Sequence, residues 1–264
     1  MAEPQIRFDD GLSYERYMGD WSRRAGSVFL DWLAAPSGLK WIDVGCGNGA
    51  FTERLIERCA PAGVVGIDPS EAQLAFARSR CNPLLAQFHQ GSATVLPFPE
   101  DRFDAAVMAL VIHFVPDPAK GVGEMTRVVR PCGLVAAYVW DALGGGDPLE
   151  PIRTEMRALG LTPAAPPSVH ASRMEALHGL WTDAGLEGIE TRAITVRRSF
   201  DSFDNFWKVS TATAGLRPTL DLMEADAIAE LKERVRGRLP ADGQGRITFG
   251  ACANAIKGHV PKSP

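Results

Sequence analysis

The chain lacks the features that mark secreted, membrane-spanning and disulfide-stabilised proteins. Its first residues, MAEPQIRFDD, are acidic and polar where a signal peptide needs a basic start and an apolar run. No stretch approaches the roughly 18 apolar residues that a transmembrane helix requires. The five cysteines are scattered, with no C-x-x-C pair or nearby pair of histidines, which argues against a disulfide framework and a zinc site. We expect a cytoplasmic protein with reduced thiols, no metal and no membrane partner.

An excess of positive charge is also missing. The chain has 28 Lys and Arg against 32 Asp and Glu, a net charge of -4, so no overall field attracts polyanions. The densest basic runs are the pairs Arg23-Arg24 and Arg197-Arg198, which are typical of solvated helix or strand faces. Nucleic acid is therefore not an expected partner. With 264 residues and 45% hydrophobic content, the chain can bury a full core, as one large domain or as a domain carrying a lid.

What is present is an alternation of short apolar runs with amphipathic stretches between residues 39 and 140, which predicts a parallel sheet covered by helices on both faces. The runs predict strands at 39–44, 64–68, 84–89, 103–110 and 134–140. The amphipathic stretches predict helices at 50–59, 70–80 and 118–129. Outside this region we expect an aromatic-rich helix at 13–33, a helix at 173–184, a strand at 189–196, a helix near 225–238 and a final strand at 247–256.

A glycine-rich turn follows the first predicted strand. The run Asp43-Val44-Gly45-Cys46-Gly47-Asn48-Gly49 lies between a strand and a helix, so its glycines allow a tight turn and a close approach to a ligand. Asp68 ends the next strand, where a carboxylate can accept both hydroxyls of a ribose. Gly45, Gly47 and Ala50 also satisfy the G-x-G-x-x-G/A pattern of dinucleotide-binding proteins, so an NAD-dependent oxidoreductase is an alternative.

Asp43 distinguishes the two cofactor classes. A carboxylate two residues before the first glycine would repel a pyrophosphate, whereas the amino and sulfonium groups of S-adenosylmethionine are cations that tolerate it or gain from it. Charge therefore favours S-adenosylmethionine. The alternative role for Asp43 is to hydrogen-bond loop amides, which is compatible with either cofactor.

Five motifs in order resemble the class I S-adenosylmethionine-dependent methyltransferases related to the ubiquinone and menaquinone biosynthesis C-methyltransferases. They are WIDVGCGNG at 41–49, GIDPS at 66–70, QGSA with LPF at 90–98, FD with ALVIH at 103–113, and EMTRVVRPCG at 124–133. The resemblance implies an α/β, doubly wound, seven-stranded and mostly parallel sheet, the Rossmann-like methyltransferase fold, with an antiparallel last strand and a helical lid.

This fold divides the chain into five expected parts. They are an N-terminal helical cap at 1–38, a cofactor-binding core at 39–141, a continuation of the core with a loop insertion at 142–201, a lid insertion at 202–246, and a final strand and tail at 247–264. The lid assignment depends on position, because the segment precedes the last strand and holds Phe203, Phe206 and Trp207.

The resemblance also implies a set of cofactor-binding residues. The methionine part of the cofactor is expected against Gly45, Cys46, Gly47, Ala109 and Leu110, the ribose on Asp68, Pro69 and Gln73, and the adenine against Gly91, Ser92 and Ala93. Ser92 departs from the family, which usually has Asp there, and a hydroxyl is the weaker acceptor for the adenine amino group. Gln73 stands where the family often has an apolar residue, so an exposed helix position is the alternative for it.

The segment from Tyr17 to Arg24 resembles the aromatic and basic stretch that closes over the cofactor in relatives. We expect Tyr17 to contact the cofactor and Arg23 to pair with its methionine carboxylate, since Arg binds carboxylates in a bidentate fashion. The alternative for Arg23 is a solvated position on a packed amphipathic helix.

Methyl transfer from a sulfonium is an in-line displacement from an activated donor, so the protein chiefly supplies alignment and a dry site. His113, just past the fourth strand, is the candidate general base, with a structural hydrogen-bonding role as its alternative. Aromatic side chains in the 13–33 helix and in the lid favour a small apolar or aromatic acceptor, unless they form the lid's own core. A non-catalytic cofactor-binding module also fits the sequence, and so does a homodimer.

Overall fold

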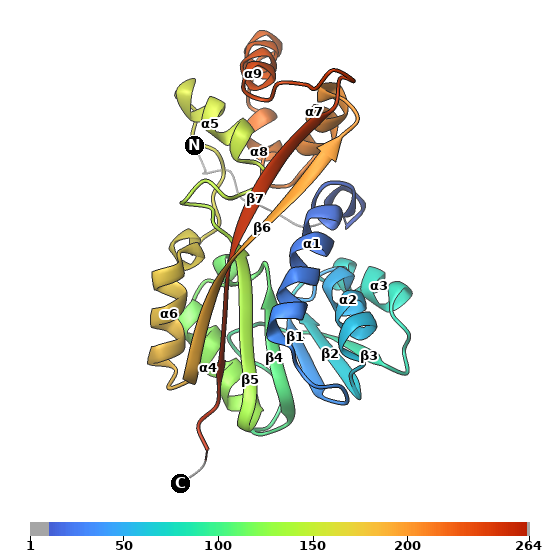
Figure 1. The fold of residues 1–264 in the computed structure, drawn as a ribbon, viewed down its shortest axis with the longest axis vertical. Coiled ribbons are helices and arrows are strands. Elements are labelled where there is room, and N and C mark those ends of the chain that lie inside the picture. The colour runs from blue at the N-terminus through green and yellow to red at the C-terminus, as the bar shows by residue number, and fades with distance from the viewer. Residues whose placement is uncertain (1–10, 263–264) are drawn as a thin grey trace.

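The structure is a computed structural model that describes the backbone of residues 11–262 and the side chains of residues 19–262. Its centre is one seven-stranded sheet with the strand order β3-β2-β1-β4-β5-β7-β6 (Figure 1). The strands are β1 Lys40–Val44, β2 Gly63–Asp68, β3 Ala86–Gln90, β4 Phe103–Ala109, β5 Val129–Trp140, β6 Glu187–Phe200 and β7 Ile247–His259. Strands β1 to β5 pair in parallel, and β7 is antiparallel to both β5 and β6. The predicted fold class is confirmed.

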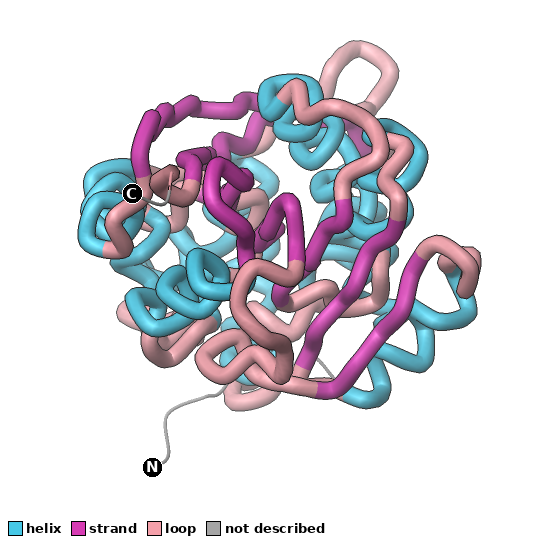
Figure 2. Tube along the Cα trace, turned by 90° about the horizontal axis from the view of Figure 1, so that it is seen from below, coloured by secondary structure: helices cyan, strands magenta, loops and turns pink. Residues whose placement is uncertain are grey.

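Helices cover both faces of the sheet (Figure 2). One face packs against α1 Gly11–Leu33, α2 Ala50–Cys59 and α3 Glu71–Arg80. The other face packs against α4 Pro118–Val128 and α6 Met174–Asp183. Residues 134–140 of β5 are buried without alternation, as expected for a central strand covered on both sides.

Strands β6 and β7 extend past the ends of the parallel strands and carry a group of helices at that end of the molecule (Figure 1). These helices are α5 Glu150–Ala158, α7 Phe203–Thr211, α8 Arg217–Leu220 and α9 Ala225–Arg238. Two short 3-10 helices, η1 Ile112–Phe114 and η2 Val169–Ser172, lie in the connections. One continuous apolar cluster joins this group to α1 and the sheet. No helix within residues 11–262 is both long and apolar enough to cross a bilayer.

Sequence patterning does not predict α5 and α7, and it underestimates β6 and β7. Helix α5 begins two residues after Pro148, inside a region whose glycines and prolines mask its helical pattern. Helix α7 has a conventional start, since Ser202 Oγ accepts a hydrogen bond from Asn205 N at 3.1 Å. Strands β6 and β7 are long because they pair with each other from Glu190 and Lys257 to Phe200 and Ile247.

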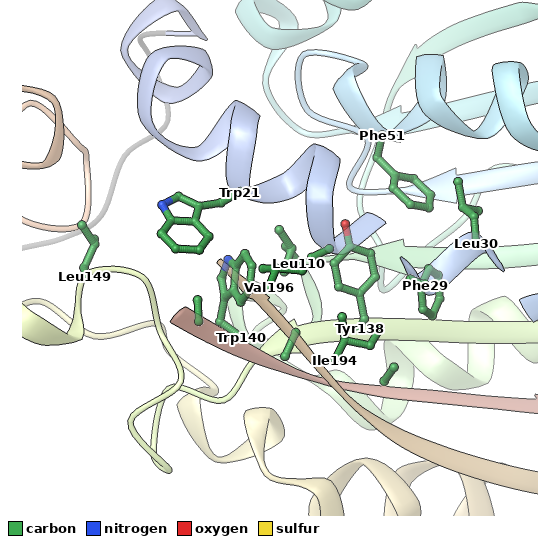
Figure 3. Close-up of a cluster of buried hydrophobic side chains, with 14 of the residues drawn as sticks. Trp21, Phe29, Leu30, Phe51, Leu110, Tyr138, Trp140, Leu149, Ile194 and Val196 are labelled. Carbon is green, nitrogen blue, oxygen red and sulfur yellow. The ribbon is translucent and has the colours of Figure 1, made fainter. Parts of the chain in front are cut away.

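Helix α1 is fixed on the sheet by aromatic packing (Figure 3). Trp21 and Phe29 are fully buried. The Trp21 ring meets Trp140 of β5 edge-on at 6.3 Å between centroids, and the Phe29 ring lies 4.6 Å from Tyr138 of the same strand. Such pairs add to the free energy gained from burying the ring area itself. The aromatic residues of α1 thus hold the helix over the ends of β4 and β5.

Leu55 and Leu84 offer a matched test of this packing. Leu55 of α2 is fully buried, whereas Leu84 is 89% exposed. We expect Leu55→Ala to lower the free energy of unfolding by about 2–5 kcal/mol, because it removes buried surface and leaves a cavity. Leu84→Ala should change it by less than about 0.5 kcal/mol. Urea unfolding followed by circular dichroism measures both, and equal losses would contradict the described packing of α2.

Candidate active site

The glycine turn between β1 and α2 is held in left-handed backbone conformations. Gly45, Gly47 and Gly49 have φ values of +79°, +51° and +77°. A Cβ on Gly45 would lie 2.4 Å from Val111 Cγ1, so a side chain is excluded there by contact as well as by backbone strain. A Cβ on Gly47 would meet no atom within 4 Å. The turn therefore presents bare backbone to an open space.

Asp68, at the end of β2, is bonded to this turn. Its Oδ2 accepts a hydrogen bond from Gly47 N at 2.9 Å, and its Oδ1 accepts one from Ser70 N at 2.9 Å. Burial raises the pKa of the Asp68 carboxyl, while the two amide hydrogen bonds oppose the rise. Each carboxylate oxygen can accept a further hydrogen bond, so Asp68 is able to bind a vicinal diol.

Asp43, at the end of β1, is fully buried and only partly compensated. Thr52 Oγ1 donates to its Oδ2 at 2.6 Å, whereas its Oδ1 has no hydrogen-bond partner among the described residues. Burial raises the pKa of Asp43 to about 7; the Thr52 hydrogen bond opposes this rise and the charge of Asp68 adds to it. A cation placed beside Oδ1 would stabilise the ionised form.

Cys46 lies between these two acids without nucleophilic character. It is 6% exposed, and its Sγ would stand 2.8 Å from a Cβ placed on Gly66. Burial raises the pKa of the Cys46 thiol, and the charges of Asp43 and Asp68 raise it further. The thiol therefore stays protonated and fills space under the turn.

These groups line one cavity of about 500 Å³ at the carboxyl ends of β1, β2 and β4. Twelve of the residues predicted to bind the cofactor lie on its wall: Asp43, Gly45, Cys46, Gly47, Asp68, Pro69, Gln73, Gly91, Ser92, Ala93, Ala109 and Leu110. Gln73 is 5% exposed, so the alternative of an exposed helix position is wrong. Ser92 Oγ already accepts a hydrogen bond from Thr94 N at 3.2 Å, which reduces its capacity to accept another.

Leu110 gives the wall of the cavity a strained backbone. Its φ of +63° is unusual for a residue with a branched side chain, and the conformation is held by its N–H, which donates to Tyr138 O at 2.8 Å. Strain of this kind persists where the surrounding structure over-determines it, and it is frequent at ligand sites. Leu110 follows Ala109 at the end of β4. Both residues are expected to lie against the methionine part of the cofactor.

Sequence analysis missed the residues that reach the cavity from outside the five motifs. Ser22 of α1 is 9% exposed, and its Oγ has no hydrogen-bond partner among the described residues. Phe51, Phe114 and Tyr138 supply aromatic surface. The remaining residues of the wall are Asn48, Ala50, Ile67, Ser70, Val111, Val115 and Pro116. The pattern of Ser22 within an amphipathic helix offers no signal that separates it from a surface serine.

Of the three remaining predicted site residues, Arg23 and His113 are not brought to this cavity, and Tyr17 cannot be placed relative to it. Tyr17 lies in α1, but its side chain is outside the described residues. Arg23 lines a second cavity and not this one. His113 in η1 is 4% exposed, does not line the cavity, and meets the Phe114 ring edge-on at 4.2 Å. Burial lowers the pKa of His113 to about 4; Asp147 opposes the shift and Arg153 adds to it.

His113 thus lies beside the cavity wall and not on it. The residue stands just past β4, as expected, but the 3-10 turn of η1 directs the chain so that its neighbours Phe114 and Val115, and not His113, reach the cavity wall. Among the described residues no cluster of three or more His, Cys, Asp or Glu side chains is placed to hold a metal ion.

The strand order, the glycine turn and the two strand-end acids define a class I methyltransferase fold with its cofactor cavity. Comparison with known proteins agrees with this class. Residues 42–137 match a family model described as a methyltransferase domain. This part of the chain is therefore similar to methyltransferase domains, and the sheet has the strand order of that fold.

The individual relatives are similar over part of their length. An uncharacterized methyltransferase of Mycobacterium bovis is 33% identical over 138 residues, 51% of this chain and 54% of that protein. A 2-phytyl-1,4-naphtoquinone methyltransferase of Synechococcus elongatus is 34% identical over 116 residues, 42% of this chain and 48% of that protein. The chain thus spans about half the length of these curated relatives.

A solved structure shows the same fold across most of the chain. The phosphoethanolamine N-methyltransferase 2 of Haemonchus contortus, determined with S-adenosyl-L-methionine, superposes with a TM-score of 0.59 at 17% identity. The match covers 97% of this chain and 58% of that one.

The raised pKa of Asp43 predicts that the stability of the protein depends on pH. In the folded protein its pKa is about 7, against 3.8 for an unperturbed Asp, so the folded state retains a proton that the unfolded chain loses. Stability therefore falls as pH rises from about 4 to about 7, by at most about 4 kcal/mol at 1.36 kcal/mol per pKa unit. We expect Asp43→Asn to reduce the loss of stability between pH 5 and pH 8 that urea unfolding records for the wild type.

The exposed Asp183 provides the control, since Asp183→Asn removes the same charge from the surface. It should leave the difference in stability between pH 5 and pH 8 unchanged. If Asp43→Asn behaves like Asp183→Asn, Asp43 does not hold its proton up to neutral pH.

Proposed function

We propose that this protein transfers a methyl group from S-adenosylmethionine to a small apolar or aromatic acceptor by in-line displacement. The observation that carries the proposal is the buried Oδ1 of Asp43, which lies at the glycine turn without a hydrogen-bond partner among the described residues. A cationic ligand would stabilise this carboxylate, whereas a pyrophosphate would be repelled by it. The residues present therefore fit a sulfonium cofactor better than a dinucleotide.

Each part of this cofactor has a matching part of the cavity. We assign the methionine end to the backbone of Gly45 and Gly47, because a Cβ at Gly47 would meet nothing and the space is open to a ligand. The ribose is assigned to Asp68, whose oxygens are oriented by two amides and retain acceptor capacity. The adenine is assigned to the wall at 91–93, where the engaged hydroxyl of Ser92 makes a weak acceptor.

When bound, the cofactor supplies an activated methyl group, and the protein's contribution is orientation and exclusion of water. Asp43 acts on the methionine end of the cofactor, and Asp68 holds its ribose. Phe51 and Phe114 line the same cavity and provide an apolar wall for the acceptor. No role in proton transfer is assigned to His113, because it is buried outside the cavity wall.

The choice of acceptor class is supported by this aromatic wall and by the similarity to a naphthoquinone methyltransferase. We further propose that residues 39–141 form the cofactor-binding core and that 202–246, which contains α7, α8 and α9, acts as the lid. The aromatic residues Phe203 and Phe206 of α7 are buried, so they contribute to the packing of the lid and not to the cavity wall.

Isothermal titration calorimetry with S-adenosylhomocysteine and with NAD tests the cofactor class. We expect the wild type to bind S-adenosylhomocysteine and not NAD. Asp68→Ala should weaken binding of S-adenosylhomocysteine by at least about tenfold, because it removes a charged acceptor for the ribose hydroxyls. Asp183→Ala, far from the cavity, should bind like the wild type. Tight binding of NAD without a response to S-adenosylhomocysteine would refute the proposal.

Methyl transfer itself is tested with labelled S-adenosylmethionine and a panel of quinol, phenol and aliphatic acceptors. Transfer to at least one apolar or aromatic acceptor, lost in Asp68→Ala and retained in Asp183→Ala, is the expected result. Binding of S-adenosylhomocysteine without transfer to any member of the panel would favour the non-catalytic module.

A further inference from the structure

A second cavity, of about 490 Å³, lies between α1, α2 and β6. It is separate from the proposed methyltransferase site, although both use the same two helices. Ser22 of α1 lines the cofactor cavity and the next residue, Arg23, lines the second one. In α2, Phe51 lines the cofactor cavity and Arg54 lines the second one.

Four arginines line this second cavity, although the whole chain has a net charge of -4. They are Arg23 and Arg24 of α1, Arg54 of α2 and Arg197 of β6. The two arginine pairs that are distant in the sequence are thus brought to one place by the fold. These arginines are expected on separate, solvated helix and strand faces, but the structure places them around one cavity.

Asp20 is the one carboxylate that residues 19–262 contribute to the wall of this cavity, and it is already engaged. Asp20 Oδ2 accepts a hydrogen bond from Arg24 Nε at 2.9 Å and lies 3.3 Å from Arg198 Nε. Among the described residues, Asp20 and Glu57, which pairs with Arg54, are fewer than the arginines that they contact or adjoin, so this part of the structure keeps a positive charge.

Two of the guanidinium groups retain donors for a ligand. Arg54 Nη1 donates to Glu57 at 2.7 Å, but Arg54 Nε is buried and has no hydrogen-bond partner within the described part of the chain. Arg197 is exposed and forms no ion pair with any described residue. A buried donor without an acceptor is unfavourable, and the exposed guanidinium of Arg197 can donate hydrogen bonds to an anion in the cavity.

We propose that this cavity binds a phosphate monoester group. A phosphate monoester carries close to two negative charges at neutral pH and three acceptor oxygens, which match several guanidinium forks better than a single carboxylate does. The group belongs to a soluble phosphorylated metabolite or to the headgroup of phosphatidic acid, since both present the same chemistry. The proposal does not rest on methyl transfer, and its test involves no cofactor.

Arg197 is the residue to vary, because it is exposed and its loss leaves the core intact. We measure binding of glycerol 3-phosphate by calorimetry at constant ionic strength, and co-sedimentation with phosphatidylcholine vesicles that contain phosphatidic acid. Arg197→Gln should weaken binding about tenfold, as expected for a charge-assisted hydrogen bond. Arg197→Lys, which keeps the charge but not the fork, should weaken it less.

Arg192→Gln is the matched control. Arg192 is an exposed residue of the same strand, and it does not line the cavity. It should change binding by less than about twofold. If glycerol 3-phosphate binds, and Arg197→Gln weakens binding while Arg192→Gln does not, the cavity binds a soluble phosphate monoester. If only the vesicles bind, with the same effects of the two variants, the cavity binds a lipid headgroup. No binding to either probe, or equal effects of Arg192→Gln and Arg197→Gln, would overturn the proposal.

Discussion

The cofactor cavity depends on the hydrogen bonds that tie the glycine turn to the end of β2. Gly45 N and Cys46 N both donate to Ile67 O, at 2.7 and 3.0 Å, and Gly47 N donates to Asp68 Oδ2. These bonds join the ends of two neighbouring parallel strands, so the turn and Asp68 behave as one unit. Left-handed glycines are required for this path of the chain, because other residues adopt such conformations only at a cost. The position of every other cavity residue is set relative to this unit.

The same arrangement places two carboxylates close together in a largely buried site. Asp68 is compensated by two amide donors, whereas Asp43 receives one hydroxyl hydrogen bond from Thr52. Burial of a carboxylate with an oxygen unpartnered is unfavourable, so Asp43 weakens the ligand-free fold. A role in ligand binding would explain why a destabilising residue stands at this position. The ligand that a buried carboxylate would bind is a cation. Stability and binding are therefore opposed at Asp43.

The parts of the site that could be predicted from the sequence are those encoded locally. Gly45, Gly47 and Asp68 follow apolar strands directly, and parallel strands bring their carboxyl ends to one edge, so strand prediction suffices to place them together. The positions of Arg23 and His113 depend on tertiary structure. Adjacent positions on a helix point about 100° apart, so the orientation of α1 decides that Ser22 and not Arg23 reaches the cofactor cavity. The contribution of Tyr138 likewise requires the strand order.

Helix α1 contacts the core, the cofactor cavity and the second, arginine-lined cavity (the basic cavity) through three of its faces. Trp21 and Phe29 pack on β5, Ser22 reaches the cofactor cavity, and Arg23 reaches the basic cavity. Because the buried aromatic residues fix the rotation of the helix, they also determine which polar residue faces which cavity. A rotation of α1 that put Arg23 in the place of Ser22 would bring a guanidinium into the cofactor cavity, and Arg24 would then take the place of Arg23. The charge of both cavities thus depends on the packing of Trp21 and Phe29, which line neither cavity.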